Sequence, residues 1–560
     1  MYDWLILNGT LHDGLGSLAR RADLAISGGR IAAIGDLSRA EAAHTLDAAG
    51  RWVCPGFIDA HSHSDAYLLV EPSAASKLTQ GITTEITGNC GASAAPRFGG
   101  YELPSDWRQQ TYPRPWRTVA EYRALLAECR PAIHSRMLCG HRNLRAAVMG
   151  TAPRAATPDE VRAMVRLLDQ ALDEGAAGVS TGLVYAPAMF AGRDELLALC
   201  RSAARRGGLY ATHMRSESAR LLEAVDEALD LARSTGVRLQ VSHLKTSGRR
   251  NWHKIGELLE KLRRARASGT DVASDRYPYT ASGTDLDILL PEWAEQDGRD
   301  AILARVRDGA TRARILAEWA ACRTDADWDT VWIGCTHAPE NAPFTGRPLR
   351  EAADAWHLPP PEAALRFMDT DDLYTGGFFF GMSEDNMRRI LAEPWIMVGS
   401  DASLRAPTGP LAADHPHPRA YGTMARYLRL ALDELHLPAP EAIRKITSLP
   451  AERFRLSGRG ILREGNWADI TVLDPSAFRD TATYAKPHSF CTGITAVFVD
   501  GTPALLDGKP TAARAGTYIR FLHQSLAVVG ECVAEGAVEP AVVVFTLDQY
   551  AAVHQPFQCG

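Results

Sequence analysis

The apolar run Trp52-Val53-Cys54-Pro55-Gly56-Phe57-Ile58-Asp59-Ala60 ends directly before His61-Ser62-His63. Side chains at positions i and i+2 of a strand point to the same face, so His61 and His63 can hold one metal ion together. A bare His-x-His also occurs in polar loops that bind no metal. A metal site is favoured here because four further ligand-type residues follow at later predicted strand ends.

The length and composition limit the classes of protein that fit. The chain has 560 residues, 46% of them hydrophobic, so we expect one large domain with additions. The formal charge of -6 is mild and well mixed, which implies no nucleic-acid and no membrane-surface partner. Ten cysteines without a Cys-x-x-Cys pair favour a reducing cytoplasm over a disulfide scaffold. The first residues lack a basic segment followed by a long apolar core, so we expect neither a signal peptide nor a transmembrane helix.

Strand and helix patterns alternate through the middle of the chain. The eight predicted strands are Phe57 to His63, Thr84 to Cys90, Arg136 to His141, Gly178 to Tyr185, Leu209 to His213, Leu239 to His243, Asp271 to Tyr277 and Ile396 to Asp401. Alternation predicts a parallel sheet, and eight repeats predict an α/β fold of the TIM type, a (β/α)8 barrel over residues 56–455. Residues near 285–350 do not fit one βα unit and are predicted to be an insertion.

The sequence patterns at both ends of the chain predict short strands. Ala22 to Ile26 and Arg30 to Ile34 flank Ser27-Gly28-Gly29, which is a hairpin signal. A similar pattern returns at Ala468 to Leu473 and Ala496 to Val499. We therefore expect residues 1–55 and 456–517 to pair as one small β-sandwich domain. Residues 518–560 are a C-terminal extension of unknown role, in which Ala541 to Phe545 is predicted to be a strand.

Six residues with ligand-type side chains fall at the predicted strand ends: His61, His63, Cys90, His213, His243 and Asp401. Imidazole, thiolate and carboxylate groups all bind zinc. Each residue alone has a simpler explanation, since Cys90 can be a small buried hydrophobe and Asp401 a helix N-cap. All six at strand ends, in barrel order, predict a metal site and metal-assisted hydrolysis, with Asp401 as general base and then acid.

The sequence resembles the amidohydrolase superfamily and, within it, the N-acyl-D-amino-acid deacylases (D-aminoacylases). The matching segments cover about residues 1 to 518, and they are Pro55 to Asp65, Gly88-Asn89-Cys90-Gly91, Ser180 to Tyr185, Thr212 to Glu217, Ser242 to Lys245, Asp275 to Tyr279, Gly399-Ser400-Asp401, His417 to Thr423, Ser448 to Ala451 and Leu462 to Asp469. The resemblance implies a tight zinc ion at Cys90, His213 and His243. It also leaves open a second, weaker metal at His61, His63 and Asp401, with the cysteine in place of the bridging lysine of other branches.

The resemblance also implies residues that bind an N-acyl-D-amino acid. Lys245 and Arg419 match the positions for the free carboxylate, Tyr277 is their hydrogen-bond partner, and Met382 lines the side-chain pocket. A surface ion pair for the two cations, and ordinary core packing for Met382, stay open as alternatives. Two departures from the family pattern put the substrate preference in doubt: Ser282-Gly283 is exchanged in order, and Arg142 stands where the family has glycine. The aromatic segment Trp107 to Trp116 is also unusual and is a candidate cap of the pocket.

Two other functions remain as alternatives. One is hydrolysis of a cyclic amide, as in hydantoinases and dihydropyrimidinases, for which the expected bridging lysine is not evident. The other is a non-catalytic relative, which loss of ligands would support, although all six candidates are present. The expected partner is a small acylated amino acid or short peptide, and a homo-oligomer is left open.

Overall fold

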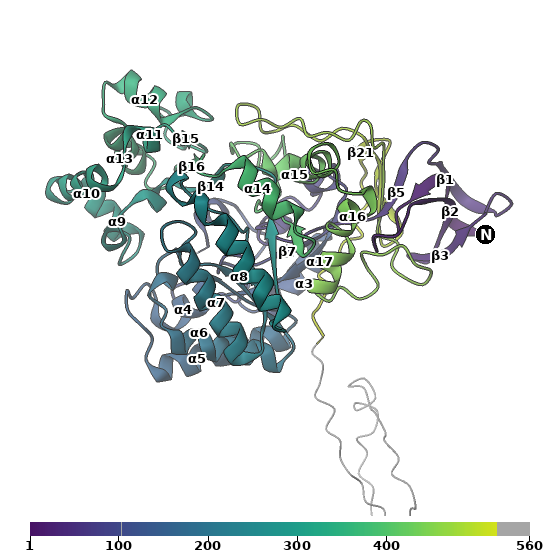
Figure 1. Ribbon diagram of the computed structural model, residues 1–560, viewed down its shortest axis with the longest axis horizontal. Helices are drawn as coiled ribbons and strands as arrows, with labels where there is room; N and C mark the ends of the chain where they lie inside the picture. The colour runs from purple at the N-terminus through teal and green to yellow at the C-terminus, as the bar shows by residue number, and fades with distance from the viewer. Residues whose placement is uncertain (102, 523–560) are drawn as a thin grey trace, which may run out of the picture. The chain divides into compact units, whose positions relative to one another are not determined.

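Parallel strands alternating with helices form the centre of the fold (Figure 1). The computed structural model describes residues 1–101 and 103–522. One parallel sheet has the order β17-β13-β12-β11-β10-β9, and a second has the order β6-β7-β8. Their bounds are β6 Phe57–Asp59, β7 Ile82–Thr87, β8 His134–Met137, β9 Cys139–Gly140, β10 Gly178–Gly182, β11 Leu209–His213, β12 Arg238–Val241, β13 Val272–Arg276 and β17 Ile396–Val398. The predicted α/β class is therefore confirmed.

Hydrogen bonds connect the two parallel sheets at both edges. On one side only Leu138 separates β8 from β9, and its amide donates to Thr87 O at 2.9 Å. On the other side Ala60 N donates to Val398 O at 3.2 Å, and Asp401 N donates to His61 O at 2.7 Å. The third predicted strand is therefore divided at Leu138. Met137, before it, pairs with β7, whereas Cys139, after it, pairs with β10.

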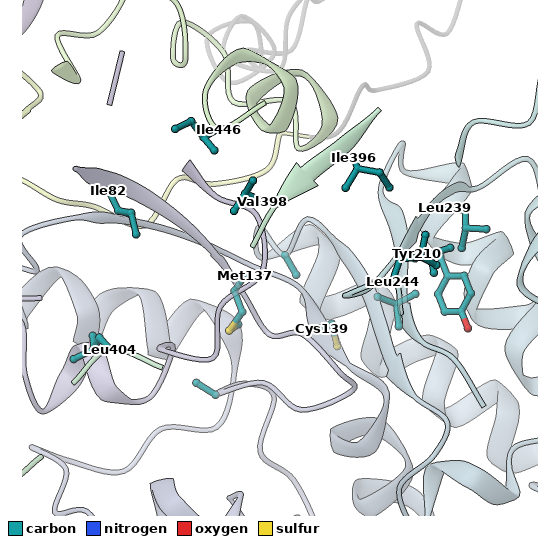
Figure 2. Packing of buried hydrophobic residues seen from close by; sticks show 14 of the residues in the cluster. Ile82, Met137, Cys139, Tyr210, Leu239, Leu244, Ile396, Val398, Leu404 and Ile446 are labelled. Atoms are coloured by element: carbon teal, nitrogen blue, oxygen red, sulfur yellow. The ribbon is translucent and has the colours of Figure 1, made fainter. Parts of the chain in front are cut away.

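Helices cover the outer face of these strands, and the strand side chains alternate between two apolar clusters. In β11, Tyr210 belongs to the cluster shared with the helices, whereas Leu209 and Ala211 belong to a second cluster. β17 repeats the pattern with Met397 between two residues of the first cluster, as the two-residue period of a strand requires. Figure 2 shows the first cluster, with side chains from β7, β8, β11, β12 and β17. The covering helices include α3 Val119–Cys129, α4 His141–Met149, α5 Pro158–Asp173, α6 Arg193–Arg205, α7 Leu221–Thr235, α8 Ile255–Ala267, α14 Glu384–Ala392 and α15 Arg419–Arg429.

Strands from both chain ends pair in one nine-stranded sheet. Its order is β21-β20-β19-β18-β5-β1-β2-β3, with β4 paired to β1. The bounds are β1 Tyr2–Leu11, β2 Arg20–Ser27, β3 Arg30–Gly35, β4 Ala42–Asp47, β5 Trp52–Pro55, β18 Ile470–Leu473, β19 Ile494–Val499, β20 Thr502–Leu506 and β21 Lys509–Pro510. The two ends meet where β5 runs antiparallel to β18, from Pro55 opposite Ile470 to Trp52 opposite Leu473. The expected pairing of the chain ends, and the hairpin of β2 and β3, are both present.

A separate segment lies between β13 and α14. It contains a three-stranded antiparallel sheet in the order β14-β16-β15, made of Ser282–Asp285, Gly376–Phe379 and Val331–Ile333. Its helices are α9 Arg299–Arg307, α10 Gly309–Cys322, α11 Asp325–Trp328, α12 Leu349–Trp356 and α13 Pro360–Thr370, and they gather at one side of Figure 1 around their own apolar core. The segment is longer than the predicted insertion near 285–350, because the chain must return to pair β16 with β14.

The last described residues run beside β8, where Tyr518 forms a parallel bridge with Ser135. Ile519 N donates to Ser135 O at 2.8 Å, and Phe521 is buried in the second apolar cluster. Residues 1–521 form one compact unit, and the predicted strand Ala541 to Phe545 lies outside the described residues. None of the helices in residues 1–101 and 103–522 is both long and apolar enough to cross a membrane.

Candidate metal and substrate site

The six predicted ligands lie at the carboxyl ends of five parallel strands. His61 and His63 follow β6, Cys90 follows β7, His213 is the last residue of β11, His243 follows β12 and Asp401 follows β17. Because parallel strands end on the same side, the strand order brings these side chains together.

The ligand-type atoms form two overlapping groups. One group is Cys90, His213 and His243, and the other is His61, His63, Cys90 and Asp401; within each, the candidate atoms all lie within 4.8 Å of one another. Cys90 Sγ is 3.4 Å from His61 Nε2 and 3.3 Å from His243 Nε2, so the thiol belongs to both groups. Asp401 Oδ1 is 3.1 Å from His63 Nε2 and 3.4 Å from His61 Nε2.

The loops that carry the ligands adopt unusual backbone conformations. Cys90, His243 and Asp401 have φ values of 51°, 34° and 52°, a region that side chains other than glycine rarely occupy. Gly88, at φ 72°, allows the first of these loops to form, since a Cβ there would lie 2.1 Å from Leu138 O. Such conformations persist where the surrounding structure fixes them, and they concentrate at functional sites.

The charges around the site favour ionised ligands. Burial raises the pKa of the Cys90 thiol, but the imidazoles of His243 and His61 more than offset this and hold it well below its usual value. Burial likewise raises the pKa of Asp401, while Arg419 and His243 lower it well below the usual range. A thiolate and a carboxylate are the forms that bind a divalent cation.

The two predicted carboxylate-binding cations are already paired with acidic side chains. Lys245 Nζ donates to Glu217 Oε1 at 2.6 Å, and Arg419 Nη1 donates to Asp401 Oδ2 at 2.8 Å. Both cations are buried and line the same cavity as five of the six ligands, which disfavours the alternative of a surface ion pair. Tyr277 does not line this cavity: it is fully buried, and its ring lies 4.7 Å from the Arg419 guanidinium carbon.

The cavity has a volume of about 1250 Å³ and extends from the ligand cluster to the segment between β14 and β16. Met382 lines it and belongs to a small apolar cluster with Tyr277 and Tyr279. Arg276 Nη2 donates to Met382 Sδ at 3.1 Å, so the thioether has a polar neighbour as well.

The departures from the family pattern also lie at this cavity. Arg142 lines it, and its amide donates to Gly91 O at 2.8 Å, beside Cys90. Gly283, of the exchanged pair Ser282-Gly283, accepts a hydrogen bond from Arg419 Nη2 at 3.2 Å. Trp107 lines the cavity as well, although its side chain is almost completely buried.

Several residues of the site were not predicted from the sequence. Asp275 Oδ1 lies 3.1 Å from His61 Nδ1, and Lys77 Nζ lies 2.8 Å from Asp59 Oδ2 and 3.5 Å from Glu85 Oε2. Lys77, Asp59 and Glu85 are fully buried beneath the ligands. Asp59 and Asp275 lie close in sequence to predicted site residues, and this proximity could have indicated them. Lys77 lies in a short helix (α1, Ala75–Leu78) that carries no motif, so nothing in the sequence indicated its role.

Comparison with known proteins agrees with this geometry. The model of a family described as "Amidohydrolase family" matches residues 44–504. The chain belongs to the amidohydrolase family. Among its relatives within this family, D-aminoacylase of Alcaligenes xylosoxydans xylosoxydans is 37% identical over 92% of this chain and 97% of its own length. N-acyl-D-glutamate deacylase of the same organism is 39% identical over 94% of this chain and 98% of its own length.

Solved structures of amidohydrolases are also similar to this chain. N-acyl-D-glutamate deacylase from Bordetella bronchiseptica, complexed with zinc and a phosphonate inhibitor, has a TM-score of 0.79 at 35% identity, covering 93% of this chain and 99% of that one. A crystal structure of D-aminoacylase has a TM-score of 0.79 at 34% identity and covers 93% of this chain and 100% of its own. These relatives support a fold of the TIM-barrel type for this chain.

We predict that Lys77→Met destabilises the protein strongly. The substitution leaves the buried carboxylates of Asp59 and Glu85 without their cation, which costs about 3–5 kcal/mol in comparable cases. Denaturant unfolding measures the change. Lys261→Met is the matched control, since Lys261 forms a half-exposed pair with Asp226 and its loss is expected to cost about 1 kcal/mol or less. Equal stability of the two variants would contradict the prediction.

Proposed function

We propose that this protein hydrolyses the amide bond of N-acyl-D-amino acids with the help of zinc, releasing a carboxylate and a free D-amino acid. The observation that carries the proposal is the convergence of Cys90, four histidines and Asp401, of which all but the fully buried His61 line the cavity. Relatives that are 37–39% identical over nearly the whole chain are named D-aminoacylase, N-acyl-D-aspartate deacylase and N-acyl-D-glutamate deacylase.

The side chains of the site fit zinc. A thiol with a lowered pKa and imidazole nitrogens lie within a few ångströms of one another, and the buried Nδ1 of His213 has no hydrogen-bond partner in the described structure. We assign Cys90, His213 and His243 to a tight position and His61, His63 and Asp401 to a weaker second one. A structure of D-aminoacylase that is 34% identical is described with a binuclear centre, "one-metal activation and second-metal attenuation".

The chemistry is divided between the metal and Asp401. When bound, zinc supplies Lewis acidity, which favours loss of a proton from water and polarises a carbonyl group. Asp401 is ionised and points into the cavity, so it can take the proton of the attacking water and pass it to the leaving nitrogen. Arg419 holds the carboxylate of Asp401 through Oδ2 and leaves Oδ1 toward His63 and His61.

The substrate's free carboxylate would bind at Lys245 and Arg419. Arg419 offers a planar guanidinium and Lys245 a compact ammonium, and they flank the Tyr277 ring at 4.7 and 5.9 Å. We place the D-amino-acid side chain against Met382, which packs with Tyr277 and Tyr279.

The proposal extends to the architecture and the setting of the protein. The hydrogen bonds at both edges of the parallel sheets support an eight-stranded (β/α)8 barrel over 56–455, and the nine-stranded sheet supports one small β-domain over 1–55 and 456–517, while its arrangement as a sandwich remains a prediction. The eight cysteines of the described residues are free thiols, which supports a cytoplasmic location. A homo-oligomer remains a prediction.

The alternatives fit the geometry less well. Hydantoinase structures match at 17% identity with a TM-score of 0.54, which supports the shared fold alone. The thiol of Cys90 stands between the two ligand groups, where a cyclic-amide hydrolase would place a bridging lysine. All six ligand-type residues converge, which argues against a non-catalytic relative.

We expect the zinc-loaded protein to release amine from N-acetyl-D-amino acids and not from the L-enantiomers. Amine release from paired substrates, with added zinc and with a chelator, measures this. Zinc-dependent release from the D series alone is the expected result. Release that survives removal of the metal, or that is confined to cyclic amides, would contradict the proposal.

Asp401→Asn is expected to lower kcat at least about 100-fold, because the amide cannot accept the water proton. The tight position, made by other residues, should keep its zinc. Steady-state kinetics and metal analysis of the purified variant measure the two effects. Asp433→Asn, at a half-exposed helical position away from the cavity, is the control. A near-wild-type kcat would remove Asp401 from its role.

Lys245→Met is expected to lower kcat/KM about 10- to 100-fold for N-acetyl-D-leucine, since one charge-assisted hydrogen bond contributes about 1.5–3 kcal/mol. The same variant should change turnover of N-acetyl-D-leucinamide far less, because this substrate has no free carboxylate. Lys261→Met is the control, as Lys261 pairs with Asp226 and lies outside the cavity lining. An equal loss of kcat/KM on both substrates would argue that Lys245 does not bind the substrate carboxylate.

A further inference from the structure

Glu217 lies between two of the candidate metal ligands and the predicted substrate cation. It follows His213 by four residues, lines the cavity and has a side chain that is 13% exposed. Its Oε1 is 2.9 Å from His243 Nδ1 and 2.6 Å from Lys245 Nζ, and its Oε2 is 3.5 Å from His213 Nε2. The carboxylate has no other hydrogen bond or ion pair in the described part of the chain.

The two imidazoles each turn one nitrogen to Glu217 and the other away from it. His243 Nε2 lies 3.3 Å from Cys90 Sγ, while its Nδ1 lies 2.9 Å from Glu217 Oε1 and 2.7 Å from the Lys245 ammonium, which is paired with the same oxygen. His213 turns Nε2 to Glu217, and its buried Nδ1 lacks a hydrogen-bond partner among the described residues. A neutral histidine that binds a metal through one nitrogen carries its proton on the other, and an acceptor behind it fixes both the tautomer and the ring orientation.

We propose that Glu217 is a positioning residue that serves both rings and Lys245 at once. One carboxylate lies 2.9 Å from the rear nitrogen of His243 and 3.5 Å from that of His213, so it can accept the proton that each ring carries there when its other nitrogen binds a metal, and it holds two ligands of the tight metal position in the same arrangement. Through Oε1 it also fixes the ammonium of Lys245. For the role of Lys245 this inference rests on the proposed function; for the metal ligands it does not.

Asp275 provides a comparison within the same site. It lies 3.1 Å behind His61 Nδ1, but it also accepts from Gln240 Nε2 and from the amide of His243, both at 2.8 Å. Asp275 therefore has structural partners that would account for its burial. Among the described residues the Glu217 carboxylate has only the two histidines and Lys245 as partners, so the site accounts for the position of its charge.

The test is Glu217→Gln, which keeps the size of the side chain and removes its charge. We expect zinc affinity, measured by competition with a chromophoric chelator, to fall about 10- to 100-fold. The visible absorption of the cobalt-substituted protein should shift, because the ligand rings reorient. KM for N-acetyl-D-leucine should rise together with these changes, since Lys245 loses its fixed position. Glu217→Asp, which restores the charge on a shorter side chain, should recover part of the zinc affinity.

Glu227→Gln is the matched control, because Glu227 is a half-buried glutamate nearby in sequence that pairs with Arg215 and lies outside the cavity lining. It should leave zinc affinity and the cobalt spectrum unchanged. Unchanged zinc affinity in Glu217→Gln would overturn the inference, as would a rise in KM alone. The metal measurements need no substrate, so a protein that fails to hydrolyse N-acyl-D-amino acids but loses zinc affinity in Glu217→Gln would refute the proposed function and support this one.

Discussion

The site depends on the hydrogen bonds and ion pairs that the buried ammonium of Lys77 forms. Its Nζ donates to Asp59 Oδ2 at 2.8 Å, to Ser400 Oγ at 3.1 Å and to Ala402 O at 3.1 Å. Asp59 ends β6 and Ser400 follows β17, so one cation ties together the two strand ends that carry His61, His63 and Asp401. Charged groups without exposure to water are stable only when paired and hydrogen-bonded, and here the partners belong to strands β6 and β7 and to the loop after β17.

This arrangement explains how the ligands can adopt costly backbone conformations. Each residue held at positive φ, such as Cys90 or Asp401, costs on the order of 1–3 kcal/mol. Asp401 N donates to His61 O, and Ser400 N donates to Asp59 Oδ1, so the strained turn is fixed from the opposite strand. The free energy of these buried hydrogen bonds offsets the strain, and it does so at the place where the ligand atoms must be aligned.

Much of this fold and site follows from local patterns in the sequence. Apolar runs that end in His61-Ser62-His63, His213 and His243 predicted the strands and their order, and barrel geometry then predicted that the ends meet. The capping box formed by Thr157 and Glu160 is another local pattern, and in the structure it marks the start of α5. The partners of Lys245 and Arg419 could not be predicted in this way. Glu217 and Asp401 reach these cations only after the sheet has brought separate loops together, and no spacing in the sequence records that distance.

The ion pairs of Lys245 and Arg419 affect how a substrate carboxylate would bind under the proposed function. Lys245 is paired with Glu217 and Arg419 with Asp401, so the proposed carboxylate-binding site contains two ion pairs and not two free positive charges. Under the proposed function, a substrate carboxylate that binds Arg419 competes with Asp401 for the same guanidinium. Since Arg419 is the largest of the attractive influences that hold down the pKa of Asp401, its engagement elsewhere makes Asp401 a stronger proton acceptor. Under the proposed function, the carboxylate-binding residue Arg419 and the general base Asp401 are therefore electrostatically linked, and binding of a substrate with a free carboxylate makes the base stronger.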